Sequence, residues 1–367
     1  MTKNNQAFII DTIKESFDEQ ESLDIYKKST LIRYLTEKTK SAYRSSKARG
    51  SFANLYAIYV LIEDYCINNF QETKNYNNYE GMMFSKALLR TRELPFGDKL
   101  QNHALNSRCN DEFKKFFNVE TSEVPIYRNL STKRYKINEK LLLVELDNRT
   151  VNIAPVILKI IDKYLEVKSK NFNLFFEELE TLKNTYQSNP QNVKKFFENL
   201  LQPNVDARLF ELVSFSILKY HYLQHQIIFG ENPDSLTTYN LTLFKTGRTN
   251  ANDGGIDFIM IPTGRIFQVT EVLDFKKYFL DIEKTNHFPI TFVVKVDLSP
   301  EAVMTSIKES ALIFYPDEII RAHYISCFEE VITIPTLIDY LSQEIMTDKL
   351  ESVINELITQ SRIEYNI

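Results

Sequence analysis

The feature that most constrains the fold is an alternation of helix-like and strand-like patterns between residues 204 and 345. The pattern reads α-β-β-β-α-β-α-β-α, and its first helix begins at Asp206, an aspartate that suits the N-cap or the first turn. Residues 290–296 (ITFVVKV) form a near-continuous apolar run that fits a buried strand. This alternation predicts an α/β core with a mixed sheet.

The region before this core has a different, mainly helical pattern. Residues 1–90 show helical periodicity, which is strongest between residues 52 and 65. The character of the sequence changes near Pro203. We therefore predict two domains, a mainly helical domain of residues 1–200 and an α/β domain of residues 201–367. Other elements expected before Pro203 are strands at 135–137 and 141–146 and helices at 154–166, 171–187 and 191–201.

Composition excludes several classes of protein. Hydrophobic residues make up 43% of the chain and aromatic residues 13%, which is too many for a disordered chain. The net charge of −5 excludes a uniformly basic nucleic-acid binder but allows a local basic patch. The three cysteines are far apart, which suits a reducing cytoplasm and forms neither a zinc motif nor a disulfide framework. No run is apolar and long enough to predict a membrane span or a signal peptide.

Two strand-like segments joined by a tight turn carry the polar residues of greatest interest. Asp257, in the sequence GGID, lies on the first strand, and Gln268 lies on the second, 11 positions later. With residues 262–265 (PTGR) as the turn, the two side chains can lie side by side across the ladder. Paired oxygen ligands suit a hard divalent cation such as Mg²⁺, which can offset the charge of a phosphodiester and activate a water.

This pattern resembles the PD-(D/E)XK nuclease superfamily, and within it the type II restriction endonucleases. The resemblance rests on GGID, the hairpin, QVTE and an upstream helix with Glu211, and it covers residues 204–345. It implies a restriction-endonuclease-like mixed β-sheet core flanked by helices, and Mg²⁺-dependent cleavage that leaves a 5′-phosphate. By the same resemblance, Asp257 matches the first metal-binding aspartate, Gln268 the second metal ligand and Glu211 the glutamate of the leading helix. The GGID…Q variant looks like the branch that includes Mrr-type nucleases.

One position departs from the family pattern. The family usually has a lysine two residues after the second ligand, and this chain has Thr270 there. Glu271 could enter the site through a strand bulge, although simple alternation puts it on the opposite face of the strand. Lys245 on the preceding strand, or Lys276 or Lys277 on the next helix, could reach the site instead. The remaining alternative is a core that binds DNA without cleaving it.

Cationic side chains outside the hairpin are candidates for DNA contact. The linker 38–50 carries five cations and no acid, together with hydroxyl groups that can bond to phosphate oxygens. The turn 246–250 comes directly before the GGID motif, which favours contact with the scissile strand. The residues expected to contact DNA are Arg44, Lys47, Arg49, Arg90, Arg92, Arg108, Arg248 and Asn250.

Two other patterns point to sites of different kinds. His221 and His225 have the i, i+4 spacing of zinc ligands, but no third ligand is near in sequence, which favours packing or a surface position. Residues 102–106 (NHALN) resemble part of an HNH nuclease motif, without the second histidine or asparagine and the supporting hairpin that this motif needs.

The function predicted from sequence is a sequence-specific double-stranded DNA endonuclease of a restriction–modification system. Asp257 and Gln268 would hold Mg²⁺, Glu211 would be an outer or second-metal ligand, and Glu271 or Lys245 would polarise the water. A palindromic target predicts a two-fold homodimer. The alternatives are an Mrr-like modification-dependent nuclease, an inactive DNA-binding protein with a nuclease-like core, and a helical interaction protein unrelated to nucleic acid, which would show no salt-dependent DNA affinity.

Overall fold

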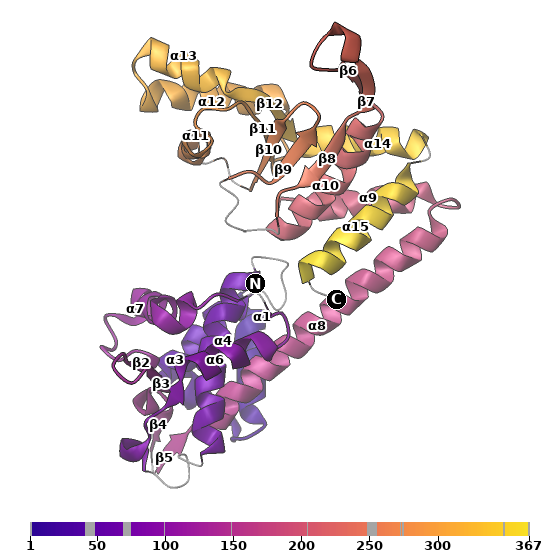
Figure 1. Ribbon diagram of the computed structural model, residues 1–367. Coiled ribbons are helices and arrows are strands. Elements are labelled where there is room, and N and C mark those ends of the chain that lie inside the picture. Colours follow the sequence, from indigo (N-terminus) through magenta and orange to yellow (C-terminus); the bar gives the residue numbers. More distant parts are fainter. Residues whose placement is uncertain are drawn as a thin grey trace. The chain divides into compact units, whose positions relative to one another are not determined.

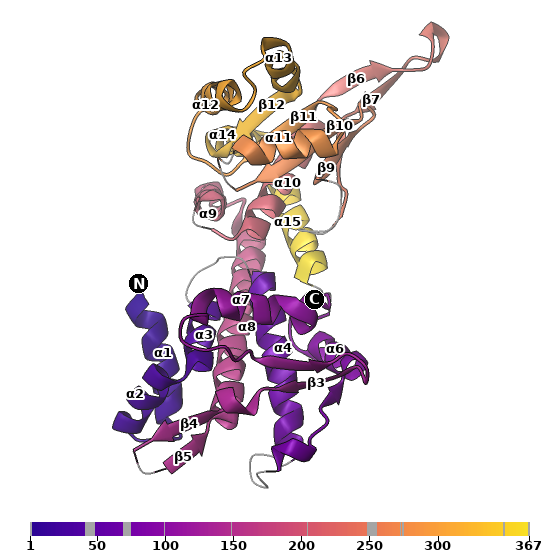
Figure 2. The same ribbon diagram turned by 90° about the vertical axis from the view of Figure 1, so that its left-hand side faces the viewer.

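The computed structural model describes residues 2–40, 48–68, 75–98, 100–147, 149–203, 205–247, 255–271, 273, 275–347 and 349–365. The chain divides into two compact units, Met1–Leu174 and Phe175–Ile367. Figures 1 and 2 show their helices and strands from two directions. The fold is therefore of the mixed α/β kind that the alternation of patterns predicted.

The first unit is mainly helical. Helix α2 begins where the Asp18 carboxylate accepts a hydrogen bond from the Glu21 amide, and α3 begins where Ser29 accepts one from Ile32. Helix α4 is central to the core, and its residues Leu55 to Ile58 are fully buried. The helices of this unit are α1 (Thr2–Lys14), α2 (Glu19–Lys28), α3 (Thr30–Lys38), α4 (Ala48–Ile67), α6 (Phe84–Glu93), α7 (Cys109–Phe117) and the first part of α8 (Ala154–Thr185), with short turns of helix η2 (Tyr76–Asn78), η3 (Ala104–Arg108) and η4 (Glu139–Leu141).

The described part of the first unit also contains two small antiparallel sheets. The strand order of one is β1 (Met82–Met83), β3 (Arg134–Ile137), β2 (Ile126–Asn129), and the other pairs β4 (Leu143–Leu146) with β5 (Arg149–Asn152). Strands β3 and β4 match the two that the sequence predicted, and a turn of 3-10 helix occupies the start of the second predicted segment.

Helix α8 is continuous where the sequence predicted two helices. Residues 167–170 (VKSK) contain neither glycine nor proline, so nothing in the backbone ends the helix there. The boundary between the two units lies inside this helix, earlier than the predicted boundary after residue 200. The reason is packing: Phe175 stacks on Phe196 of α9 (Pro190–Leu201), and Leu179 is buried in the core of the second unit.

The second unit is built on a five-stranded mixed sheet of order β12-β11-β10-β9-β8. Strands β10, β11 and β12 are parallel, and β9 pairs antiparallel with β10 and with β8. The elements of this sheet are β8 (Thr242–Lys245), β9 (Phe258–Ile261), β10 (Arg265–Thr270), β11 (Ile290–Val294) and β12 (Phe328–Thr333). Strands β9 and β10 form the predicted hairpin, and β11 lies within the apolar run 290–296.

Helices cover both faces of this sheet (Figures 1 and 2). On one face, Phe258 and Phe267 pack against α9, α10, α14 and α15; we call this the α10 face. On the other face, Ile266 and Phe292 pack against α11, α12 and α13; we call this the α11 face. These helices are α10 (Ala207–Leu223), α11 (Phe275–Lys284), α12 (Pro300–Phe314), α13 (Glu318–Ser326), α14 (Ile334–Met346) and α15 (Leu350–Tyr365).

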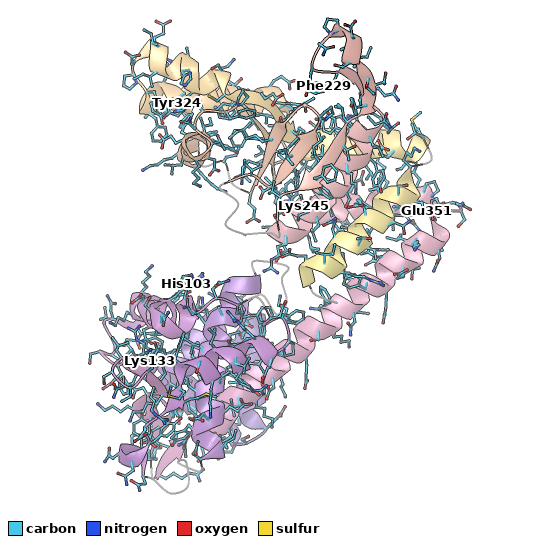
Figure 3. The ribbon with its side chains drawn as sticks, viewed as in Figure 1. His103, Lys133, Phe229, Lys245, Tyr324 and Glu351 are labelled. Carbon is cyan, nitrogen blue, oxygen red and sulfur yellow. The ribbon has the colours of Figure 1, made fainter. Side chains whose placement is uncertain are left out.

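Three elements of the second unit were missed in the sequence patterns: α13, α15 and a hairpin of β6 (Gln226–Phe229) and β7 (Thr237–Asn240), which are joined by the short helix η5 (Pro233–Ser235). The hairpin extends away from the sheet and exposes Phe229, which Figure 3 labels. Because neither face of the hairpin is buried, its sequence has no alternation of apolar and polar residues to indicate strands.

None of the described helices combines the length and the apolar composition that crossing a bilayer requires.

Candidate active site

Several strand ends of the second unit meet at one edge of the sheet. The amide of Thr246, just after β8, donates to the Asp257 carbonyl (3.0 Å), and the amide of Lys295, just after β11, donates to the Thr270 carbonyl (2.9 Å). Lys245, labelled in Figure 3, is the last residue of β8 at this edge. In α/β sheets, ligands bind in the crevice beyond the carboxyl ends of the strands. This edge is therefore the expected position of a functional site.

Asp257 lies at this edge beside strand β10. Its amide donates to the Phe267 carbonyl (2.9 Å), and its Oδ2 accepts a hydrogen bond from the Val269 amide (2.6 Å). These two bonds span Gln268, so Asp257 and Gln268 are neighbours across the hairpin, as the spacing predicted. The side chain of Asp257 is half-buried.

Gln268 points to the α11 face and is 8% exposed. Its Nε2 donates to the Val269 carbonyl (3.2 Å), while its Oε1 is buried and has no hydrogen-bond partner among the described residues. A buried oxygen of this kind costs free energy unless a donor or a cation reaches it. Gln268, the predicted metal ligand, thus presents a buried oxygen that has no partner among the described residues. The hairpin motif alone did not indicate how deeply this side chain is buried.

A second unsatisfied oxygen comes from Asp281 on α11, a residue that the sequence interpretation did not single out. Asp281 is 2% exposed; Lys284 donates to its Oδ1 (2.7 Å), and its Oδ2 has no partner in the described part of the chain. A side-chain carbon at Gly255, where φ is +89°, would lie 3.8 Å from both Asp281 Oδ1 and Gln268 Oε1. The sequence signal for this residue was an acid on the buried face of an amphipathic helix.

Lys277 of α11 reaches the position where the family pattern has its lysine. Its Nζ donates to the hydroxyl oxygen of Thr270 (3.3 Å), which is buried on the same face as Gln268. Of the lysines that could replace the motif lysine, Lys277 therefore lies on the same face of the sheet as Gln268. We refer below to Asp257, Gln268, Asp281 and Lys277 as the α11-face cluster.

The other predicted catalytic side chains lie on the α10 face. Glu211 of α10 and Lys245 form a buried ion pair, with 2.7 Å between Oε1 and Nζ. Glu271 follows strand alternation, without the bulge that would turn it toward Gln268, and it pairs with Lys295 (3.1 Å). The Lys295 ammonium also donates to the Val205 carbonyl, next to the start of α10. The predicted catalytic set is thus divided between two faces of the sheet.

The residues predicted to contact DNA have varied surroundings. Arg90 is held by Glu63 through two hydrogen bonds (2.7 and 2.8 Å), and Arg92 donates to the Leu100 carbonyl (3.1 Å). Arg108 is exposed, in the short π-helix η3. The side chains outside the described residues are those of Arg44, Lys47, Arg49, Arg248 and Asn250.

His221 has a packing role in the core next to α14. Its ring stacks on Tyr340 with 3.6 Å between centroids, and burial, followed by the neighbouring His225, lowers its pKa to about 4. Glu344 is fully buried nearby, and its Oε1 accepts a hydrogen bond from Gln224 (2.6 Å). Burial raises the pKa of Glu344 to about 7.

Replacing Glu344 with glutamine is expected to raise the free energy of unfolding at pH 8, by up to about 3 kcal/mol, and to change it little at pH 5. Folding favours the protonated form of the Glu344 carboxyl group. The contribution of this group to stability is therefore complete below its ordinary pKa of 4.5 and is lost as the pH rises through about 7. Urea unfolding at the two pH values measures this difference. The exposed Glu309→Gln variant is the control, and an equal gain at both pH values would contradict the assignment.

Comparison with known proteins identified no family for this chain: no protein-family model, no curated protein and no solved structure matched it.

Proposed function

We propose that the second unit is a Mg²⁺-dependent nuclease that hydrolyses phosphodiester bonds in double-stranded DNA, with its active site at the α11-face cluster. The observation that carries this proposal is a pair of buried oxygens, Gln268 Oε1 and Asp281 Oδ2, that have no hydrogen-bond partner among the residues the structure describes. Both residues flank Gly255, two positions before Asp257. Carboxylate and amide oxygens are the ligands that a hard divalent cation prefers.

The residues of the cluster fit the chemistry that this reaction needs. The oxygens of Asp257, Gln268 and Asp281 would hold the ion, which when bound supplies an activated water and offsets the charge of the phosphate. Lys277 is placed at Thr270 to offset negative charge that develops in the transition state. The hydrogen bond from the Val269 amide orients the Asp257 carboxylate. Lys284, whose side chain is 56% exposed, now neutralises Asp281 and would move aside for the ion.

In this proposal the charged residues of the α10 face stabilise the fold and take no part in the reaction. Glu211 and Lys245 neutralise each other in a nearly closed environment, and Lys295, 1% exposed, is held by Glu271 and a backbone carbonyl. A restriction-endonuclease-like core and a sequence-specific activity in a two-fold homodimer remain part of the proposal. The sheet order and the helices on both of its faces support the first of these.

A matched pair of variants tests which face carries the reaction. Purified protein incubated with phage DNA and Mg²⁺ is expected to yield discrete fragments, and none with a chelator present. Asp281→Asn should lower the cleavage rate by at least about 10²-fold, because it removes a charged ligand, whereas Glu271→Gln should retain most of the activity. The reverse result would move the metal site to the α10 face. Digestion of methylated and unmethylated DNA separates a restriction enzyme from a modification-dependent nuclease.

The replacement of the motif lysine by Thr270 favours one second candidate, an inactive core that binds DNA. This candidate predicts DNA binding in a gel-shift assay that weakens steeply with salt, without cleavage in Mg²⁺ or Mn²⁺.

A further inference from the structure

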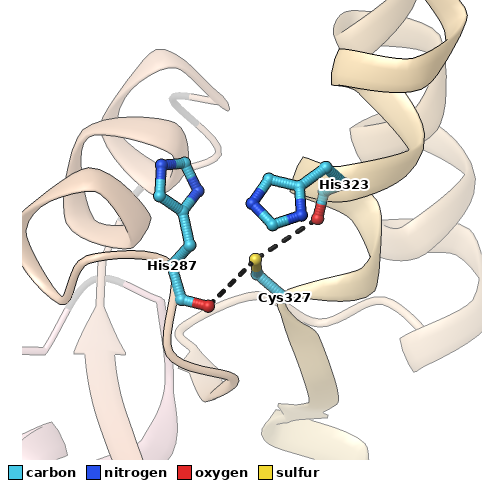
Figure 4. Close-up of side chains that lie close together, drawn as sticks. All are labelled: His287, His323 and Cys327. Atoms are coloured by element: carbon cyan, nitrogen blue, oxygen red, sulfur yellow. Dashed lines mark hydrogen bonds between the residues drawn. The ribbon is translucent and has the colours of Figure 1, made fainter.

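A histidine–histidine–cysteine cluster lies on the α11-face side of the second unit, among residues with no part in the proposed reaction. His287 belongs to the turn between α11 and β11, His323 to the last turn of α13, and Cys327 directly precedes β12. One ligand atom from each residue lies within 4.8 Å of the other two. Figure 4 shows the two rings and the thiol close together.

The backbone holds the three residues in this arrangement. The Ile290 amide donates to the Cys327 carbonyl (2.8 Å), which joins the starts of β11 and β12. The Cys327 thiol contacts the carbonyls of His287 and His323 (3.4 and 3.3 Å). The His287 amide donates to the Ile282 carbonyl (2.9 Å), which ties the turn to α11. The cluster is therefore a fixed feature of three packed elements.

Two properties of His287 point to a ligand. Its Nδ1 is buried and has no hydrogen-bond partner among the residues that the structure describes. Its backbone has φ of +63°, after Asn286 with φ of +53°, a left-handed conformation that is unfavourable for a residue with a side chain. Such conformations are found where the surrounding structure or a ligand holds them.

We propose that His287, His323 and Cys327 bind a Zn²⁺ ion, with water as the fourth ligand. Imidazole nitrogen and thiolate sulfur are the ligands that zinc prefers, and Mg²⁺ does not bind to such a set. A tetrahedral zinc ion holds its ligand atoms roughly 3.3 to 3.8 Å apart, so a small rotation of the exposed His323 side chain completes the geometry. Binding releases the Cys327 proton to solvent, and the ion links the α11–β11 turn to α13.

The test uses the full-length protein, stripped of metal by a chelator and titrated with Zn²⁺ or with Co²⁺ as a spectroscopic probe. One equivalent of Co²⁺ should bind with a thiolate-to-cobalt charge-transfer band in the near ultraviolet, and Zn²⁺ should displace it and raise the melting temperature. Cys327→Ser should abolish the band, and His323→Ala should weaken binding at least about tenfold. Cys66→Ser, a half-buried thiol in the first unit, should change neither result.

His323 is exposed, so its alanine variant is expected to fold whether or not a metal site exists. Absence of the band in the unmodified protein, or unchanged affinity in both Cys327→Ser and His323→Ala, would overturn the proposal. The readouts do not use DNA cleavage. Failure of the nuclease proposal therefore leaves this test intact, and the reverse holds as well.

Discussion

The Asp257→Ala variant is expected to lose Mg²⁺-dependent DNA cleavage, by at least about 10³-fold, while it keeps its fold and its affinity for DNA. Asp257 is the half-buried acid of the α11-face cluster, and its carboxylate is oriented by the Val269 amide. Removing it takes a negatively charged ligand from the proposed metal site. The lost hydrogen bond from the Val269 amide is expected to cost roughly 1 kcal/mol of stability.

Conversion of supercoiled plasmid to nicked and linear forms measures this effect, together with thermal unfolding and a gel-shift assay on the same preparations. Asp339→Ala, an exposed aspartate of α14, serves as the matched control and should cleave at the rate of the unmodified protein. Cleavage retained by Asp257→Ala would remove this residue from the site. If Asp257→Ala lost its fold as well as its activity, Asp257 would have a structural role. The cleavage rate of Asp281→Asn would then test the proposed metal site.

The second large effect concerns stability. Lys245→Met is expected to lower the free energy of unfolding by about 3 kcal/mol or more, because it takes the ammonium group away from the carboxylate of Glu211. The two side chains are only 9% and 7% exposed, so water replaces the lost partner poorly. The double variant Glu211→Gln, Lys245→Met should recover most of the loss, since it buries no charge at this position.

Urea unfolding of the parent, the two single variants and the double variant gives the interaction energy of the pair. Lys14→Met is the control, because the ion pair of Lys14 with Glu19 is exposed and should contribute little to stability. Additive effects of the two single changes would show that Glu211 and Lys245 do not depend on each other. If, in addition, either single variant cleaved DNA normally, the α10 face would have no catalytic part.

Local sequence patterns predicted most elements of the second unit, because helices and strands that are buried on the sheet have apolar residues at regular spacing or in continuous runs. The apolar run 290–296 contains a strand that is buried on both faces, and Asp206 caps α10 by accepting a hydrogen bond from the Arg208 amide. The spacing between Asp257 and Gln268 predicted that they are neighbours across the hairpin, since a tight turn determines the register of a hairpin. Elements without a buried face, such as the β6–β7 hairpin, have no such apolar pattern and were not predicted.

The sequence by itself predicted the alternation of helices and strands around the sheet and the hairpin of β9 and β10, and simple strand alternation put Glu271 on the opposite face from Gln268. It did not reveal which helix covers each face of that strand, because this depends on contacts between residues far apart in the chain. Only the tertiary structure placed Asp281 near Gln268, Lys277 at Thr270, and His287 beside His323 and Cys327. The physical reason is that periodicity records whether a side chain is buried, whereas its partners are decided by how the helices pack on the sheet.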